Sequence, residues 1–170
     1  MEINLDYIEL ALLLIVITFI LILISSFKKL RIEIAQKSTV NVEGNNMKLQ
    51  ALERLTLYAE RSGLKNLVER IGAHGMSTSD FHHALIQALK TEYEYNQSQQ
   101  IYVSPEVWNA ITKLKDQNIY IINHITANLP PFATALDLGK LIVEYSTNPN
   151  AELNIIVLDA LQFEAKKILS

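Results

Sequence analysis

Residues 10–24 read LALLLIVITFILILI, an apolar run that contains no charge, proline or glycine. Extended to Phe27, the run has 18 residues. A helix of that length, rising about 1.5 Å per residue, measures roughly 27 Å and nearly matches the hydrocarbon core of a bilayer. The sequence therefore predicts a transmembrane anchor within residues 1–27, a basic juxtamembrane segment and linker at 28–46, and a helical domain at 47–170.

The charges on either side of this run predict its orientation. Residues 1–27 contain no Lys or Arg, whereas Lys28, Lys29 and Arg31 follow directly. Because Lys and Arg stay on the cytoplasmic side, we expect a single-pass protein of the inner (cytoplasmic) membrane, with its N-terminus outside and its C-terminal domain in the cytoplasm. A cleaved signal peptide is the alternative, but it would need a basic start and small residues at a cleavage site, and the sequence has neither.

Aromatic and charged residues flank the run on both sides, where membrane–water interfaces are expected. The expected interface residues are Tyr7, Glu9, Phe27, Lys28, Lys29 and Arg31. Glu9 is interpreted as a carboxylate in contact with water; the alternative is a buried acid paired with a partner subunit.

The composition limits the kinds of site that the chain can carry. Its 170 residues have a net charge of −3 and include no cysteine. The absence of Cys excludes disulfides, Cys-ligated zinc, iron–sulfur clusters and thiol nucleophiles. The mildly acidic balance provides no general attraction to nucleic acid, which is therefore not expected as a partner.

The chain after residue 46 shows helical periodicity throughout. Apolar residues recur at intervals of three and four in 47–62, 64–71, 78–99, 105–129, 132–145 and 150–168. The predicted helix ends include N-caps at Ser77, Ser104 and Asn150 and a C-cap at Gly63. Residues 38–46 hold Gly44 and three Asn, so a break is predicted there. The expected fold is all-α: one transmembrane helix, then a bundle of about five or six helices.

Two motifs resemble a known family. One is LQALERL at 49–55, continuing to Glu60-Arg61, and the other is EYEYNQSQQIYVSPEVW at 92–108. Over residues 1 to about 125 the chain resembles an uncharacterised family of small membrane-anchored proteins of Bacteroidota. That resemblance implies an N-terminal span and a helical cytoplasmic domain, and it implies no particular activity.

The first motif carries two Glu–Arg pairs, Glu53-Arg54 and Glu60-Arg61. Because the pairs are seven residues apart, each residue type returns to nearly the same face of a helix. One interpretation is surface ion pairing beside a packed stripe, in which each pair contributes about 0.2–1 kcal/mol. The functional interpretation is a charged docking face for a partner helix.

The second motif is rich in tyrosine and amide side chains. Tyr93, Tyr95 and Tyr102 lie among Asn and Gln residues that include Gln99. Tyr is enriched at protein interfaces because it combines a large apolar area with a hydroxyl. We expect either a partner-binding surface here or, as the alternative, rings that cover the edge of the bundle.

The sequence shows no catalytic motif, and no metal or cofactor is expected. Its four histidines are His74, His82, His83 and His124, and none has a second ligand at the spacing that zinc helices use. There is no nucleophile elbow, phosphate-binding loop or dinucleotide-binding glycine pattern.

The expected function is therefore non-enzymatic. The helical domain would act as an accessory or scaffold subunit that docks to a larger membrane-associated assembly, with the bilayer and one or more proteins at its inner face as partners. The alternative is a membrane-tethered sensor or small-ligand module, for which Asn118 and His124 are the only polar hints near a core helix. Self-association through the apolar run is left open. The run has no Gly-x-x-x-Gly face that would favour helix–helix packing.

Overall fold

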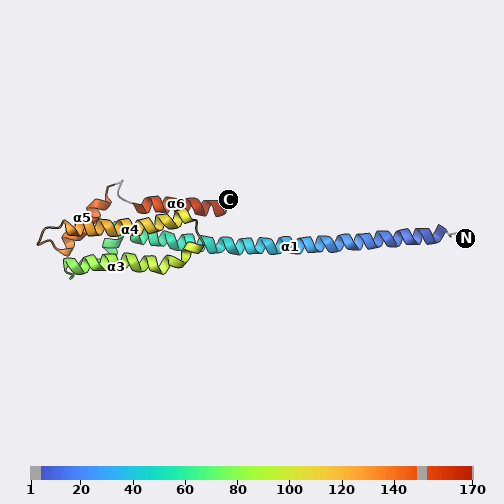
Figure 1. Cartoon of the computed structure of the whole chain (residues 1–170), viewed down its shortest axis with the longest axis horizontal. Helices are drawn as coiled ribbons and strands as arrows, with labels where there is room; N and C mark the ends of the chain where they lie inside the picture. The colour runs from blue at the N-terminus through green and yellow to red at the C-terminus, as the bar shows by residue number, and fades with distance from the viewer. Residues whose placement is uncertain (1–4, 149–152, 170) are drawn as a thin grey trace. The chain divides into compact units, whose positions relative to one another are not determined.

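A computed structural model describes residues 5–148 and 153–169, with side chains for 17–32, 42–148 and 153–169. The elements, shown in Figure 1, are α1 (Leu5–Ser62), α2 (Leu64–Ile71), α3 (Thr78–Asn96), the 3-10 helix η1 (Gln97–Ile101), α4 (Pro105–Ala127), α5 (Ala135–Ser146) and α6 (Leu153–Leu169). These ranges contain no strand, so the prediction of an all-α fold is confirmed for them. The chain forms two compact units, Met1–Asn45 and Asn46–Ser170, which are described separately.

The first unit is helical in all its described residues. The break predicted at 38–46 is therefore wrong. Helix α1 continues through that stretch, Gly44 included. Asn and β-branched residues cost only a few tenths of a kcal/mol each in a helix, and even Gly costs about 1 kcal/mol. A helix that is already propagating on both sides can absorb such costs because nucleation is the expensive step.

The expected membrane span falls only partly on described side chains. Residues 10–16 of the span lie outside them, as do Tyr7 and Glu9. Among the residues that were described, no helix combines the length and the apolarity needed to cross a membrane.

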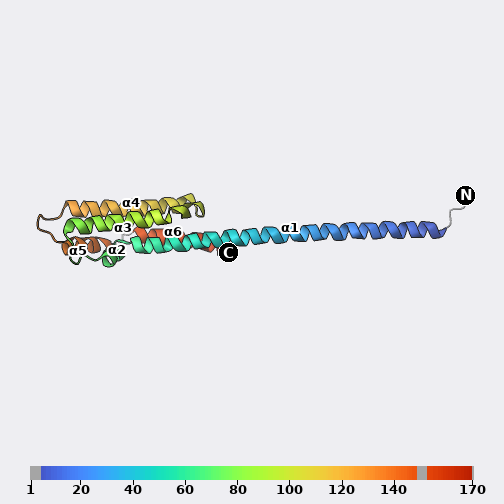
Figure 2. The same ribbon diagram turned by 90° about the horizontal axis from the view of Figure 1, so that it is seen from below.

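The second unit contains two adjoining hydrophobic clusters. In the first, α2, α3, α5 and the C-terminal half of α4 pack around Phe81, Leu85, Ile122 and Leu138, all fully buried. Helices α3 and α4 contact each other and run side by side in Figure 2, and α5 contacts α2. The apolar stripes predicted from the periodicity are buried here only in part: Phe81, Leu85 and Leu138 are buried, whereas Leu136 and Leu141 of α5 are exposed.

The second cluster joins the end of α1 to α4 and α6. Leu55 and Tyr58 from α1 pack with Ile111 and Leu114 from α4 and Leu161 from α6. Gly63 follows the last residue of α1 and lies against the Asn154 side chain of α6, since a Cβ added to Gly63 would lie 2.9 Å from Nδ2 of Asn154. This cluster therefore anchors the two helices that form the surfaces described below.

Side-chain caps set several helix starts. The Ser77 and Ser104 hydroxyls accept hydrogen bonds from the amides of Asp80 and Val107, which confirms both predicted N-caps. Helix α5 begins three residues later than expected, at a capping box between Thr134 and Asp137. The amide and hydroxyl of Thr134 donate to the Asp137 carboxylate and lower its pKa below the usual range. The predicted cap Asn150 lies outside the described residues.

Candidate partner-binding surface

Helix α1 separates the two members of each Glu–Arg pair onto different sides. Arg54 and Arg61 line a depression against α3, whereas Glu53 and Glu60 line a groove against α6. Consecutive helical residues point about 100° apart and residues seven apart nearly coincide, so the repeat sorts the charges by sign. The side chain of Leu57, 57% exposed, borders both hollows. We call these hollows the arginine side and the glutamate side of α1.

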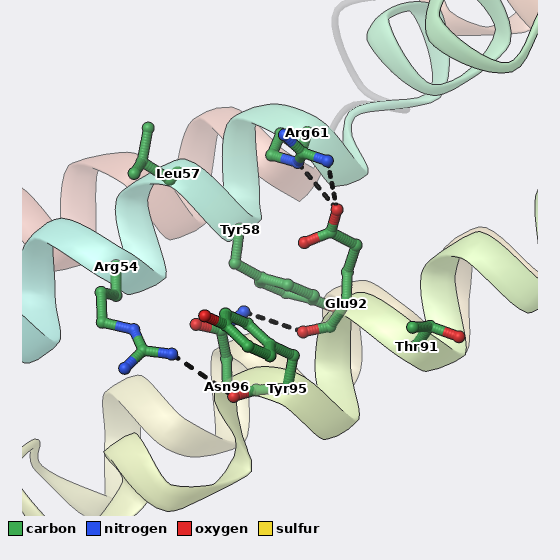
Figure 3. A pocket seen from close by; sticks show the side chains of 8 residues that line it. All are labelled: Arg54, Leu57, Tyr58, Arg61, Thr91, Glu92, Tyr95 and Asn96. Atoms are coloured by element: carbon green, nitrogen blue, oxygen red, sulfur yellow. Dashed lines mark hydrogen bonds and ion pairs between the residues drawn. The ribbon is translucent and has the colours of Figure 1, made fainter.

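The arginine side is a depression of about 370 Å³ whose charges have partners within the chain. In Figure 3 the Arg61 guanidinium points at the Glu92 carboxylate, and its Nε donates to Oε1 at 2.8 Å. Arg70 adds a longer contact, with Nη1 3.8 Å from the same oxygen. Arg54 lies over the Tyr95 ring at 5.0 Å and donates to the Tyr95 carbonyl over a long 3.5 Å. Residues of α3 thus contact both arginines.

A buried pair of hydroxyls lies beneath this depression. Tyr58 and Ser62 are each 1% exposed, and neither hydroxyl makes a hydrogen bond to any described residue. Burial raises the pKa of the Tyr58 hydroxyl above its usual range, with a smaller opposing influence of Ser62. The phenol therefore stays neutral, and Figure 3 shows its ring lying between α1 and α3.

The glutamate side is a longer groove of about 580 Å³ between α1 and α6. Its floor is apolar, with Leu52 and Leu161 buried at the base. Its charged lining residues are Glu53, Glu60 and Asp159, and no Lys, Arg or His lines it. None of these three carboxylates makes a hydrogen bond or ion pair with the part of the chain that is described.

The tyrosine-rich motif divides between interior and surface. Tyr93 is half-buried: its ring packs against Trp108 and Tyr58, its hydroxyl lies 3.0 Å from the Thr112 hydroxyl, and the Lys115 ammonium lies 4.2 Å from its ring centre. Tyr95, two residues on, is 72% exposed. Residues two apart on a helix point about 200° apart, so Tyr93 faces the packing and Tyr95 faces outward.

The remaining members of this motif lie on η1 and after it. Gln99 is buried at 7% exposure and its amide donates to the Ser98 hydroxyl, while Tyr102 is half-buried. The structure thus brings Tyr95 together with Arg54, and it keeps Gln99 and Tyr93 in packed positions. Whether these residues bind a partner stays a prediction.

Two long-range polar contacts were not identifiable from the sequence. The Asn118 amide donates to the Ser62 carbonyl at 2.7 Å in a buried site, where it satisfies the last turn of α1. The Glu164 carboxylate accepts from the Ser104 amide and hydroxyl, which ties α6 to the start of α4. In the sequence, Asn118 is distinguished only as a polar residue on a core stripe. Its partner Ser62 is 56 residues away.

Three of the four histidines have identified neighbours, one of them on another helix. His82 Nε2 lies 2.7 Å from the Asn123 side-chain oxygen, and His83 Nδ1 lies 2.7 Å from the Ser79 carbonyl. His124 is exposed and stacks on Tyr120. Within the described residues, no three His, Asp or Glu side chains are grouped closely enough to hold a metal ion.

The expected membrane-interface residues with described side chains are all exposed. Phe27 is 66% exposed, and Lys28, Lys29 and Arg31 are exposed beside it on α1. The apolar side chains that precede them are exposed as well, since each residue from Phe19 to Ile24 is more than 40% exposed.

Comparison with known proteins identifies a family but no characterised relative. No curated protein and no solved structure matches the chain. The model of a family of unknown function matches residues 3–168. Membership of an uncharacterised family, expected from the two motifs, is therefore confirmed; the source in Bacteroidota and the membrane anchor stay predictions.

Proposed function

The chain belongs to this family of unknown function, DUF7935, and we propose that it is a non-enzymatic, single-pass membrane protein. In this proposal its helical domain is an accessory or scaffold subunit that docks to a larger assembly at the inner face of the membrane. The N-terminus lies outside and the C-terminal domain lies in the cytoplasm. The proposal includes residues 10–16, which the described side chains do not cover.

The observation that carries this proposal is the exposed apolar circumference of α1. The six consecutive residues Phe19–Ile24 are Phe, Ile, Leu, Ile, Leu and Ile, with exposures from 42% to 61%. Six residues at 100° each turn through more than a full circle, whereas a single packed neighbour covers a stripe only a little over 100° wide. An apolar medium that surrounds the helix fits these side chains best, and a bilayer is such a medium.

The charges that follow support the orientation. Lys28, Lys29 and Arg31 come directly after the apolar stretch, and no Lys or Arg precedes it in the sequence. Basic residues at the end of a span favour the cytoplasmic side and are attracted to anionic headgroups there.

The accessory-subunit proposal is supported by how the domain uses its polar groups. Asn118, which first suggested a ligand-binding core, is engaged in holding the end of α1. His124, the other hint, is exposed on α4. Neither of these two side chains therefore supports the sensor alternative, whereas an unpartnered charged groove on α1 favours docking.

Membrane attachment is tested by extraction of cell membranes at alkaline pH, which removes peripheral proteins. We expect the native chain to stay with the membranes. A variant with Ile20→Lys and Leu23→Lys should be released, since each charge at a helix centre costs about 2.5–3.5 kcal/mol on insertion. The matched control is Met47→Lys with Leu57→Lys, two apolar residues later on α1 that are 53% and 57% exposed, which should stay. Release of the native chain would contradict the anchor.

Docking is tested by tagging the chain at its native level and purifying it from its own membranes in mild detergent. We expect stoichiometric membrane subunits in the mass spectrum. A chain that purifies alone, even after mild cross-linking in intact cells, would contradict the accessory-subunit proposal.

A further inference from the structure

The glutamate side of α1 combines an apolar floor with a single sign of charge. Leu52 and Leu161 form its base, Leu57 stands half out of it, and carboxylates supply its charged lining residues. These lie on both of its walls, with Glu53 and Glu60 on α1 and Asp159 on α6. An occupant must therefore offer apolar side chains along its middle and positive charge at both edges.

The matching groups on the other side of α1 show why this groove is available. Arg61 and Arg54 already contact Glu92 and Tyr95 on α3. By contrast, the described part of the chain gives Glu53, Glu60 and Asp159 no hydrogen bond or ion pair. A partner's Lys or Arg would gain these carboxylates without displacing an existing contact. The same negative field repels phosphate groups, so nucleic acid and anionic lipid are poor occupants.

The shape of the groove favours a helical occupant. Both walls are helices, whose backbone groups are used internally and offer no edge to an extended strand. An extended peptide would leave its own amides unpaired over the leucine floor, at a cost of about 1–3 kcal/mol for each buried group. A helix satisfies its backbone internally and presents a stripe at the i, i+3, i+4 and i+7 spacing. The wall from Leu49 to Glu60 measures roughly 17 Å, about three helical turns.

We propose that the groove between α1 and α6 binds a basic amphipathic helix of a partner protein. Leucine-like residues of that helix occupy the floor over Leu52 and Leu161, and its Lys or Arg residues pair with Glu53, Glu60 and Asp159. This inference rests on the docking function proposed above and specifies the surface and the chemistry of the partner.

The test uses the full chain in phosphatidylcholine nanodiscs and a fluorescent Leu/Lys amphipathic helix of about 18 residues. A Leu/Glu helix of the same pattern is the charge-reversed probe, and empty nanodiscs set the background. The groove variant is Glu53→Gln, Glu60→Gln and Asp159→Asn. Its matched control is Glu69→Gln, Glu94→Gln and Asp116→Asn, which removes the same charge from residues outside the groove.

We expect the Leu/Lys helix to bind the native chain and the control variant equally, and the groove variant at least about tenfold more weakly. The Leu/Glu helix should not bind above background. Equal binding to all three chains, equal loss in the control variant, or no binding of the Leu/Lys helix to the native chain would overturn the inference. These results do not depend on membrane extraction or on purification of the native assembly, so the proposed function can fail or stand separately.

Discussion

The two sides of helix α1 carry charges from the same repeated motif, yet they differ in what those charges contact. On the arginine side, α3 supplies a carboxylate to Arg61 and an aromatic ring to Arg54. On the glutamate side, α6 contributes Asp159, another carboxylate, and leaves the charges of one sign together. Identical spacing in sequence therefore produced an internal contact on one side and an unpartnered groove on the other.

This difference shows that the residues of a Glu–Arg repeat on a helix do not all belong to one surface. Structural ion pairing and a charged docking face were competing interpretations of the same four residues. The structure gives the arginines the role of intramolecular contacts, and the groove on the glutamate side is the part that supports docking. Three stability measurements test this difference between the two sides.

The largest effect is expected for a comparison of Tyr93 with Tyr95, both on α3, the helix that contacts the two arginines. Tyr93→Ala removes the ring contacts to Tyr58 and Trp108 and the hydroxyl contact to Thr112. It should lower the unfolding free energy by about 2–4 kcal/mol. Tyr95→Ala, at an exposed position, should lower it by about 0.5 kcal/mol or less. Denaturant titration followed by circular dichroism measures both; equal losses would mean that the motif does not divide between interior and surface.

A middle-sized effect is expected where α1 ends. Asn118→Ala leaves the buried Ser62 carbonyl without its donor and should cost about 1–3 kcal/mol of unfolding free energy. The neighbouring exposed Gln117→Ala serves as the control and should change stability by no more than about 0.5 kcal/mol. If the rate of hydrogen exchange at the last turn of α1 is unchanged in Asn118→Ala, the hydrogen bond from Asn118 to Ser62 does not stabilise the end of α1.

The smallest effect is expected when the charge of Arg61 and the charge of Glu60 are removed in separate variants. Arg61→Met breaks a partly exposed ion pair with Glu92 and should lower stability by about 1 kcal/mol or less, with a smaller loss at high salt. Glu60→Gln, one residue earlier, breaks no contact with the described residues and should leave the melting temperature unchanged or slightly raised. Thermal melts at low and high salt distinguish the two; a clear loss in Glu60→Gln would mean that the glutamate side is already partnered.

Local sequence signals predicted most of the helical domain. Ser77 and Ser104 marked helix starts, and the period of apolar residues marked the buried faces, because caps and amphipathic stripes act within one or two turns. The predicted break at 38–46 is the contrast, since weak helix formers lower helix stability without ending a helix that continues on both sides. The residues of the candidate surface were predicted from the sequence. Their division into an arginine side and a glutamate side was not predicted.

The sequence alone determined that the chain after residue 46 is helical, which faces of its helices are apolar, and that Glu and Arg repeat with one helical register. Tertiary structure decided which of those charges has a partner, that Tyr93 is packed while Tyr95 is exposed, and that Asn118 serves the end of α1. The reason is physical: helix periodicity and capping are set by residues within a few positions of one another, whereas each of these contacts joins segments tens of residues apart, whose approach depends on how whole helices pack.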